Sequence, residues 1–74
     1  MAMTHTHGSA AIEHVCHRLR SYGILTERAL TELLHPAIWA DEGMRGILDQ
    51  AQRAGRVRHL GGGVYDLTDT ERGR

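Results

Sequence analysis

The chain has 74 residues, with nine arginines, no lysine and nine acidic residues, so it carries no net charge at neutral pH. A chain of this length has room for one domain and buries too little surface to form a deep catalytic cleft. Cys16 is its single cysteine, which excludes an internal disulfide and favours a reducing compartment, expected to be the cytoplasm. No apolar run approaches the roughly 20 residues that a membrane helix needs.

A first helix is predicted to begin at Ser9, after a flexible segment at residues 1–8. Apolar residues then recur at three- and four-residue intervals, the spacing of one buried helical face. They are Ala11, Ile12, Val15, Cys16, Leu19 and Tyr22. Gly23 is expected to end this helix in a left-handed conformation, with Ile24 touching Leu19 just beyond it.

A second, short helix is predicted from Glu27, because Thr26 is a favourable N-cap. Leu25 and Leu30 occupy the two positions of a hydrophobic staple around this cap. The helix should end near Leu34, because Pro36 restricts the residue that precedes it to extended backbone. Residues 36–40 are then either one extra helical turn or an irregular connection.

A third helix is predicted with Asp41 as its N-cap and Gly55 at its end. Its inward residues are Met44, Ile47, Leu48 and Ala51. Gly43 and Gly46 lie in its first turns, where each costs about 1 kcal/mol relative to alanine.

A β-hairpin is predicted from Val57–Leu60 and Val64–Leu67 around three glycines at 61–63. Residues 68–74 are polar and are expected to fray. One core is expected to join the helices to the hairpin. Its predicted members are Ile12, Val15, Leu19, Leu30, Leu33, Leu34, Met44, Ile47, Leu48, Val57, Tyr65 and Leu67.

The stretch from Ile24 to Leu67 resembles the winged helix-turn-helix superfamily. The resemblance depends on three motifs, which are Leu25-Thr26-Glu27, Ala54-Gly55-Arg56-Val57 and Gly63-Val64-Tyr65-Asp66-Leu67. It implies a mainly α domain over residues 9–67, with three helices and a C-terminal two-stranded wing. The connection at 35–40 is longer than the tight turn of a compact helix-turn-helix.

The resemblance implies a small transcriptional regulator or accessory factor that places its third helix in the major groove of double-stranded DNA. Arg45, Gln52 and Arg53 would then read the groove, while Arg56 and Arg58 would hold the backbone. Residues 45–60 contain these four arginines against Asp49 alone, which gives a local charge of +3. A homodimer on paired half-sites is expected under this hypothesis.

The alternative is a protein-interaction module that docks onto a larger enzyme or complex. Glu42 and Asp49 share the face of the arginines and would repel phosphates, and the wing tip has no basic residue. The docking surface would be this face or Trp39, although we interpret Trp39 as a lid on the core.

His14 and His17 are three residues apart, with His5 and His7 upstream, a spacing that can gather a zinc, nickel or copper ion. We interpret them as solvated histidines and expect no metal and no cofactor. Catalysis is not expected, because neither Ser9 nor Ser21 has a histidine and a carboxylate in a recognisable triad pattern.

Overall fold

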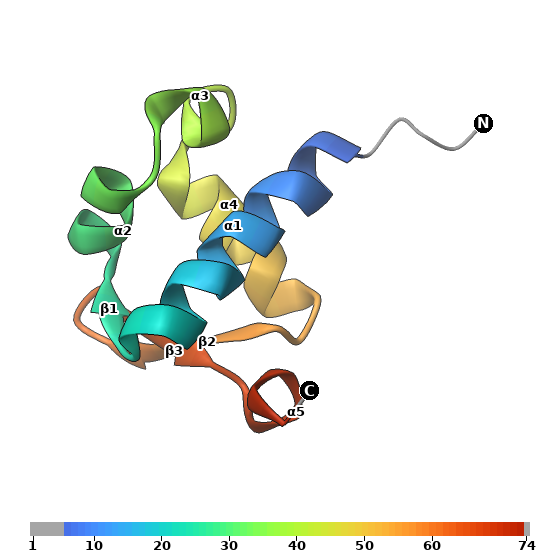
Figure 1. The fold of residues 1–74 in the computed structure, drawn as a ribbon, viewed down its shortest axis with the longest axis vertical. Coiled ribbons are helices and arrows are strands. Elements are labelled where there is room, and N and C mark those ends of the chain that lie inside the picture. The colour runs from blue at the N-terminus through green and yellow to red at the C-terminus, as the bar shows by residue number, and fades with distance from the viewer. Residues whose placement is uncertain (1–5, 74) are drawn as a thin grey trace.

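The computed structural model describes residues 6–73, with side chains from Ala10 onward, as five helices and a small three-stranded antiparallel sheet (Figure 1). In chain order these elements are α1 Thr6–Tyr22, β1 Leu25–Thr26, α2 Glu27–Leu33, α3 Pro36–Trp39, α4 Gly43–Arg53, β2 Val57–Gly61, β3 Val64–Leu67 and α5 Asp69–Arg72. Among these helices, none combines the length and the apolar character needed to cross a membrane.

The helix α1 begins at Thr6, so Ser9 lies inside the helix and the prediction that it caps the helix was wrong. The end of α1 was predicted correctly, because Gly23 has φ +89° and its N–H donates to the Leu19 carbonyl at 2.8 Å. Ile24 and Tyr22, however, are largely exposed. The prediction that Tyr22 belongs to the buried face of this helix was therefore wrong, and Ile24 keeps more than half of its surface exposed before the chain enters β1.

The helix α2 has the predicted N-cap, since the Thr26 hydroxyl accepts a hydrogen bond from the Ala29 N–H at 3.0 Å. The segment after α2 forms one further helical turn, α3, with Pro36 in its first position. Trp39 lies at the end of this turn, packs against the core and donates its indole N–H to the Leu34 carbonyl at 3.1 Å. This contact agrees with the interpretation of Trp39 as a lid.

The helix α4 ends as predicted, with Gly55 in the left-handed region at φ +75° just past its C-cap. Its start differs from the prediction, because Glu42 rather than Asp41 occupies the N-cap position and makes no side-chain capping bond. Glu42 has helical backbone angles, whereas a capping side chain needs extended ones. Gly43, at φ +80°, supplies the change of direction instead.

The sheet has the strand order β1-β3-β2, with β3 in the centre. The hairpin of β2 and β3 was predicted, but the expectation of two strands was wrong because Leu25 pairs with Tyr65 and Thr26 with Val64. Two residues of alternating exposure are too short a pattern to indicate a strand in the sequence. β1 therefore connects the end of α1 directly to the hairpin.

The core lies between α1, α2, α4 and the inner face of the sheet, as Figure 1 shows. Eleven of the twelve predicted core residues are buried, and Leu33 is the exception because it is only partly buried. The cluster also includes Ala11, Cys16 and Ala51. Cys16 is completely buried, as its position on the apolar face of α1 predicted.

Residues 69–72 form the helix α5, so the expectation of a fraying tail over this range was wrong. The Thr68 hydroxyl accepts a hydrogen bond from the Glu71 N–H at 3.2 Å and donates one to the Gly55 carbonyl at 2.8 Å. Glu71 is itself only 2% exposed. The end of the described chain is thereby attached to the body of the domain.

Candidate nucleic-acid interface

The face of α4 that points away from the core presents three of the five predicted DNA-contacting residues. Arg45 and Arg53 have side chains that are 80% and 78% exposed, and half-buried Gln52 lies on the same side, seven residues after Arg45. The buried residues Met44, Ile47, Leu48 and Ala51 occupy the opposite side of the helix. Because α1 packs against that buried side, the exposed faces of α1 and α4 point in opposite directions.

Acidic side chains within the domain neutralise this α4 face. Arg45 donates to Glu27 at 3.2 Å, and Arg53 is paired with Asp49 at 3.0 Å, one turn earlier in the helix. Glu42 lies at the start of the helix and accepts a hydrogen bond from Gln50 at 3.2 Å. The excess of arginine counted along the sequence is therefore offset by acids that the fold brings to the same surface.

Arg56 lies apart from the α4 face, in an ion-pair cluster between α1, α5 and the start of β2. Its guanidinium bonds Glu71 at 2.9 and 2.8 Å and also contacts Glu13, and its side chain is only 21% exposed. Arg20 adds a second cation to Glu71 at 3.1 Å. The hydrogen bond from Arg56 lowers the pKa of Glu13, and the two carboxylates raise the pKa of Arg56 above its ordinary value.

Arg58 lies on the outer face of the sheet, opposite Asp66 on the neighbouring strand. Its side chain is half exposed, and its nearest acidic atom is an Asp66 oxygen at 3.9 Å. Asp66 is buried, contacts Arg72 of α5 and accepts a hydrogen bond from the Leu67 N–H at 2.8 Å. Arg72 is the closer of the two partners of Asp66, so the guanidinium of Arg58 is held more weakly than that of Arg72.

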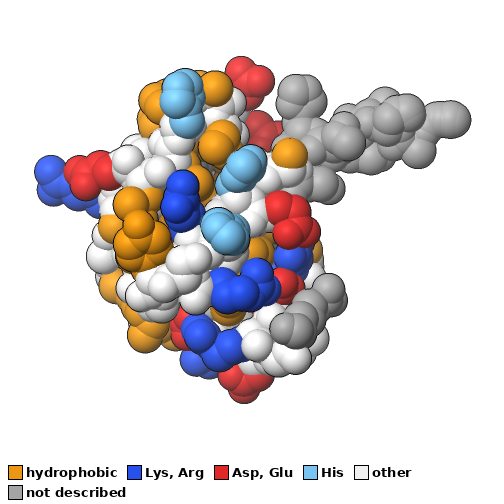
Figure 2. Space-filling model, in the orientation of Figure 1, with side chains coloured by type: hydrophobic (Ala, Val, Ile, Leu, Met, Phe, Trp, Pro, Cys, Tyr) orange, Lys and Arg blue, Asp and Glu red, His pale blue; other side chains and the backbone are white. Residues whose placement is uncertain are grey.

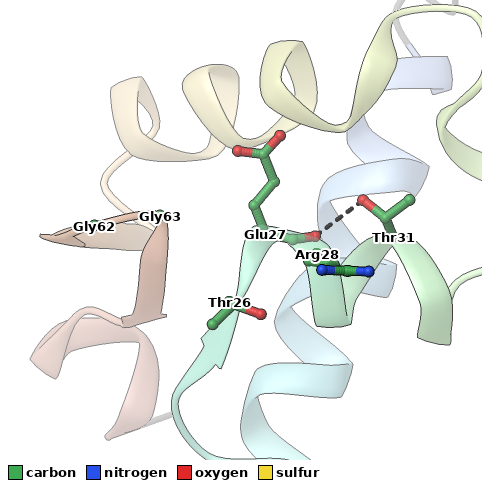
Figure 3. A pocket seen from close by; sticks show the side chains of 6 residues that line it. All are labelled: Thr26, Glu27, Arg28, Thr31, Gly62 and Gly63. Carbon is green, nitrogen blue, oxygen red and sulfur yellow. Dashed lines mark hydrogen bonds between the residues drawn. The ribbon is translucent and has the colours of Figure 1, made fainter.

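A shallow groove of about 360 Å³ lies between the start of α2 and the tip of the hairpin (Figure 3). Its lining is Thr26, Glu27, Arg28, Thr31, Gly62 and Gly63. Gly61, Gly62 and Gly63 all have positive φ, a succession that residues with side chains rarely adopt. The Gly63 carbonyl accepts a hydrogen bond from the Glu27 N–H at 2.8 Å, which holds the hairpin tip against α2.

His14 and His17 are both exposed on α1, and Figure 2 shows histidine side chains over this helix on the face toward the viewer. The side chains of His5 and His7 lie outside the described residues. Within the described part of the chain, no three histidine, cysteine, aspartate or glutamate side chains come close enough together to hold a metal ion. Burial raises the pKa of the Cys16 thiol, which makes it a poorer nucleophile at neutral pH.

Glu27 and Glu71 each bind arginines from distant parts of the chain, and these pairings were not predicted from the sequence. The sequence Thr68-Asp69-Thr70-Glu71 has the spacing of a capping box, and this signal predicts a helix at that point. No such local signal connects Glu27 to Arg45 or Glu71 to Arg56, because these pairs are distant in sequence. No protein-family model, curated protein or solved structure matches this chain.

Proposed function

We propose that the chain is a winged helix-turn-helix domain that binds double-stranded DNA. The observation that carries this proposal is the arrangement of α2, α3 and α4 followed by the β2–β3 hairpin, with β1 on the far side of β3. In this arrangement α4 is the helix that enters the major groove, and the hairpin is the wing that approaches the backbone. The outer face of α4 is open to solvent, since the buried residues of this helix lie on its other side, against the core.

Arg45 and Gln52 have the hydrogen-bonding groups that recognise guanine and adenine edges. Arg53, one residue further along α4, reaches either a base edge or a phosphate, and Arg58 contacts the backbone from the hairpin. We reassign Arg56 to stability, because its guanidinium is taken up by Glu71 and Glu13. One α4 helix offers a small contact area, so we expect two copies to bind paired half-sites.

The proposal is tested by fluorescence anisotropy, in which a labelled random-sequence duplex is titrated with the protein at several salt concentrations. Each phosphate contact contributes about −0.9 to the slope of log K against log salt. Arg53→Ala should therefore make the slope shallower by about one. Arg18→Ala is the matched control, since Arg18 lies on α1 and forms no ion pair with any described residue. Absence of binding at low salt would refute the proposal.

A second candidate function is docking onto another protein, and the neutralised α4 face favours it. The ion pairs of Arg45 and Arg53 leave this face without the surplus of positive charge that DNA-binding surfaces usually carry. The apolar contacts for such a partner would come from Tyr22, Ile24 and Leu60, which are exposed elsewhere on the surface, rather than from the α4 face or Trp39 as expected from the sequence. Affinity purification with the wild-type chain and with Ile24→Ser and Leu60→Ser variants tests this candidate. A partner captured at high salt and lost in these variants would support it.

A further inference from the structure

We propose that Glu27 positions the guanidinium of Arg45 and thereby sets which base pair the domain prefers at one position of its site. The inference rests on the proposed DNA-binding function and adds to it a residue that lies outside α4. Three contacts of Glu27 support it, which join this residue to the hairpin tip, to the next turn of its own helix α2 and to α4.

The backbone of Glu27 is fixed on both sides. Its N–H donates to the Gly63 carbonyl at 2.8 Å, and its carbonyl accepts a hydrogen bond from the Thr31 hydroxyl at 2.9 Å, drawn as a dashed line in Figure 3. Thr26, immediately before it, is fixed as the N-cap of α2. Ordering the carboxylate of Glu27 therefore costs side-chain entropy alone, because its backbone is already held in place.

The side chain of Glu27 points from the start of α2 toward α4 in Figure 3. Its carboxylate accepts a hydrogen bond from Arg45 at 3.2 Å, and it is 27% exposed whereas Arg45 is 80% exposed. A partly covered carboxylate thus binds a largely exposed guanidinium. An arginine that reads guanine must present two N–H groups in one plane, so a partner that restricts the guanidinium favours one reading geometry.

An exposed ion pair adds little to stability, typically no more than about 1 kcal/mol. Its effect on recognition can be larger, because an unrestrained arginine contacts phosphates and several base edges with similar energies. Loss of the Glu27 carboxylate should therefore increase binding to all duplexes, through reduced repulsion of phosphates, while it decreases discrimination between them. These opposite changes distinguish positioning from a general effect of charge.

The experiment selects bound duplexes from a library with a randomised central segment, using the wild type, Glu27→Gln, Arg45→Ala and the double variant. The base position that loses its preference in Arg45→Ala defines the Arg45 position. Glu27→Gln should reduce the preference there by about tenfold, within the range that one bidentate arginine contact supplies. In the Arg45→Ala background, Glu27→Gln should change the base preference at this position no further.

Glu32→Gln is the matched control, because it removes the same charge from the same helix. Glu32 is paired with Arg28 at 3.7 Å and has no contact with Arg45. If Glu32→Gln reduces the preference at the Arg45 position as much as Glu27→Gln does, the inference is overturned and the proposed function survives.

A second measurement needs no DNA and separates the two ideas. The Nη–H resonance of Arg45, the group that donates to Glu27, should shift in a ¹⁵N-labelled sample toward that of a free arginine in Glu27→Gln and stay in place in Glu32→Gln. An unchanged resonance in Glu27→Gln overturns the positioning role, whatever the selection shows. A library without enrichment by the wild type overturns the proposed function, and with it the statement about base preference, even if the resonance shifts as expected.

Discussion

Replacing Glu71 with alanine should destabilise the domain more than any other single change to its charged residues. Glu71 is 2% exposed and binds both Arg20 of α1 and Arg56, which directly precedes β2. Removing one member of a fully buried ion pair costs about 3–5 kcal/mol. Because the side chains of Arg56 and Arg20 are 21% and 46% exposed, and Arg56 keeps Glu13, water screens part of this loss. We therefore expect about 2–3 kcal/mol.

For a domain of this size, each 1 kcal/mol changes the melting temperature by about 4–8 °C, so Glu71→Ala should lower it by about 10–20 °C. Circular dichroism at 222 nm measures this, with urea denaturation as an independent measurement. Asp69→Asn is the control, because it removes one negative charge from an exposed position of the same helix and should change stability by less than about 0.5 kcal/mol. If the loss of stability in the Glu71→Ala/Arg56→Ala double variant equals the sum of the losses in the two single variants, the reasoning is refuted, since partners in one ion pair must couple.

Three further predictions concern single side chains. Burial raises the pKa of the Cys16 thiol, so the thiol ionises at lower pH in the unfolded chain than in the folded one. The stability that the buried neutral thiol contributes is complete below about pH 8.5 and is lost as the pH rises further. Cys16→Ala should therefore lose less stability at alkaline pH than the wild type does, as measured by urea denaturation. Gly55→Ala should cost about 1–2 kcal/mol of stability, because Gly55 has φ +75°. Gly46→Ala should stabilise by up to about 1 kcal/mol, because Gly46 lies inside α4 and an added Cβ would be 3.7 Å from the nearest side-chain atom, the Glu42 Cβ. Equal changes in the melting temperatures of the two variants would contradict this reasoning. Trp39→Phe removes the hydrogen bond to the Leu34 carbonyl and should cost about 1 kcal/mol in chemical denaturation, and an unchanged midpoint would show that the bond contributes nothing.

Local chemistry explains why the ends of most elements could be predicted. Thr26 caps α2, Gly23 and Gly55 adopt the left-handed backbone after α1 and α4, and Pro36 separates α2 from the next turn. Each of these signals acts within a few residues, so it can be recognised in sequence alone. The buried faces of α1 and α4 were predictable for the same reason, because the helical period places their apolar residues together.

The surface was harder to predict, because its charges pair across the fold. Arg45 and Glu27 are 18 residues apart, and Arg56 and Glu13 are 43 apart, so charges counted along the chain do not reveal these pairs. The strand β1 was missed for a similar reason, since two residues become a strand only when β3 lies beside them. Sequence periodicity therefore determined the core, whereas the charge distribution on the surface depends on tertiary structure.

The pair formed by Arg20 and Glu71 also bears on how the chain acquires its structure during synthesis. Fifty-one positions separate the two residues, and they join the first long helix to the last short one. Glu71 is synthesised after α1, α2, α4 and the hairpin, so a growing chain that already contains all its apolar core residues still lacks the shared partner of Arg56 and Arg20. We therefore expect the domain to gain this part of its stability only once α5 has been synthesised.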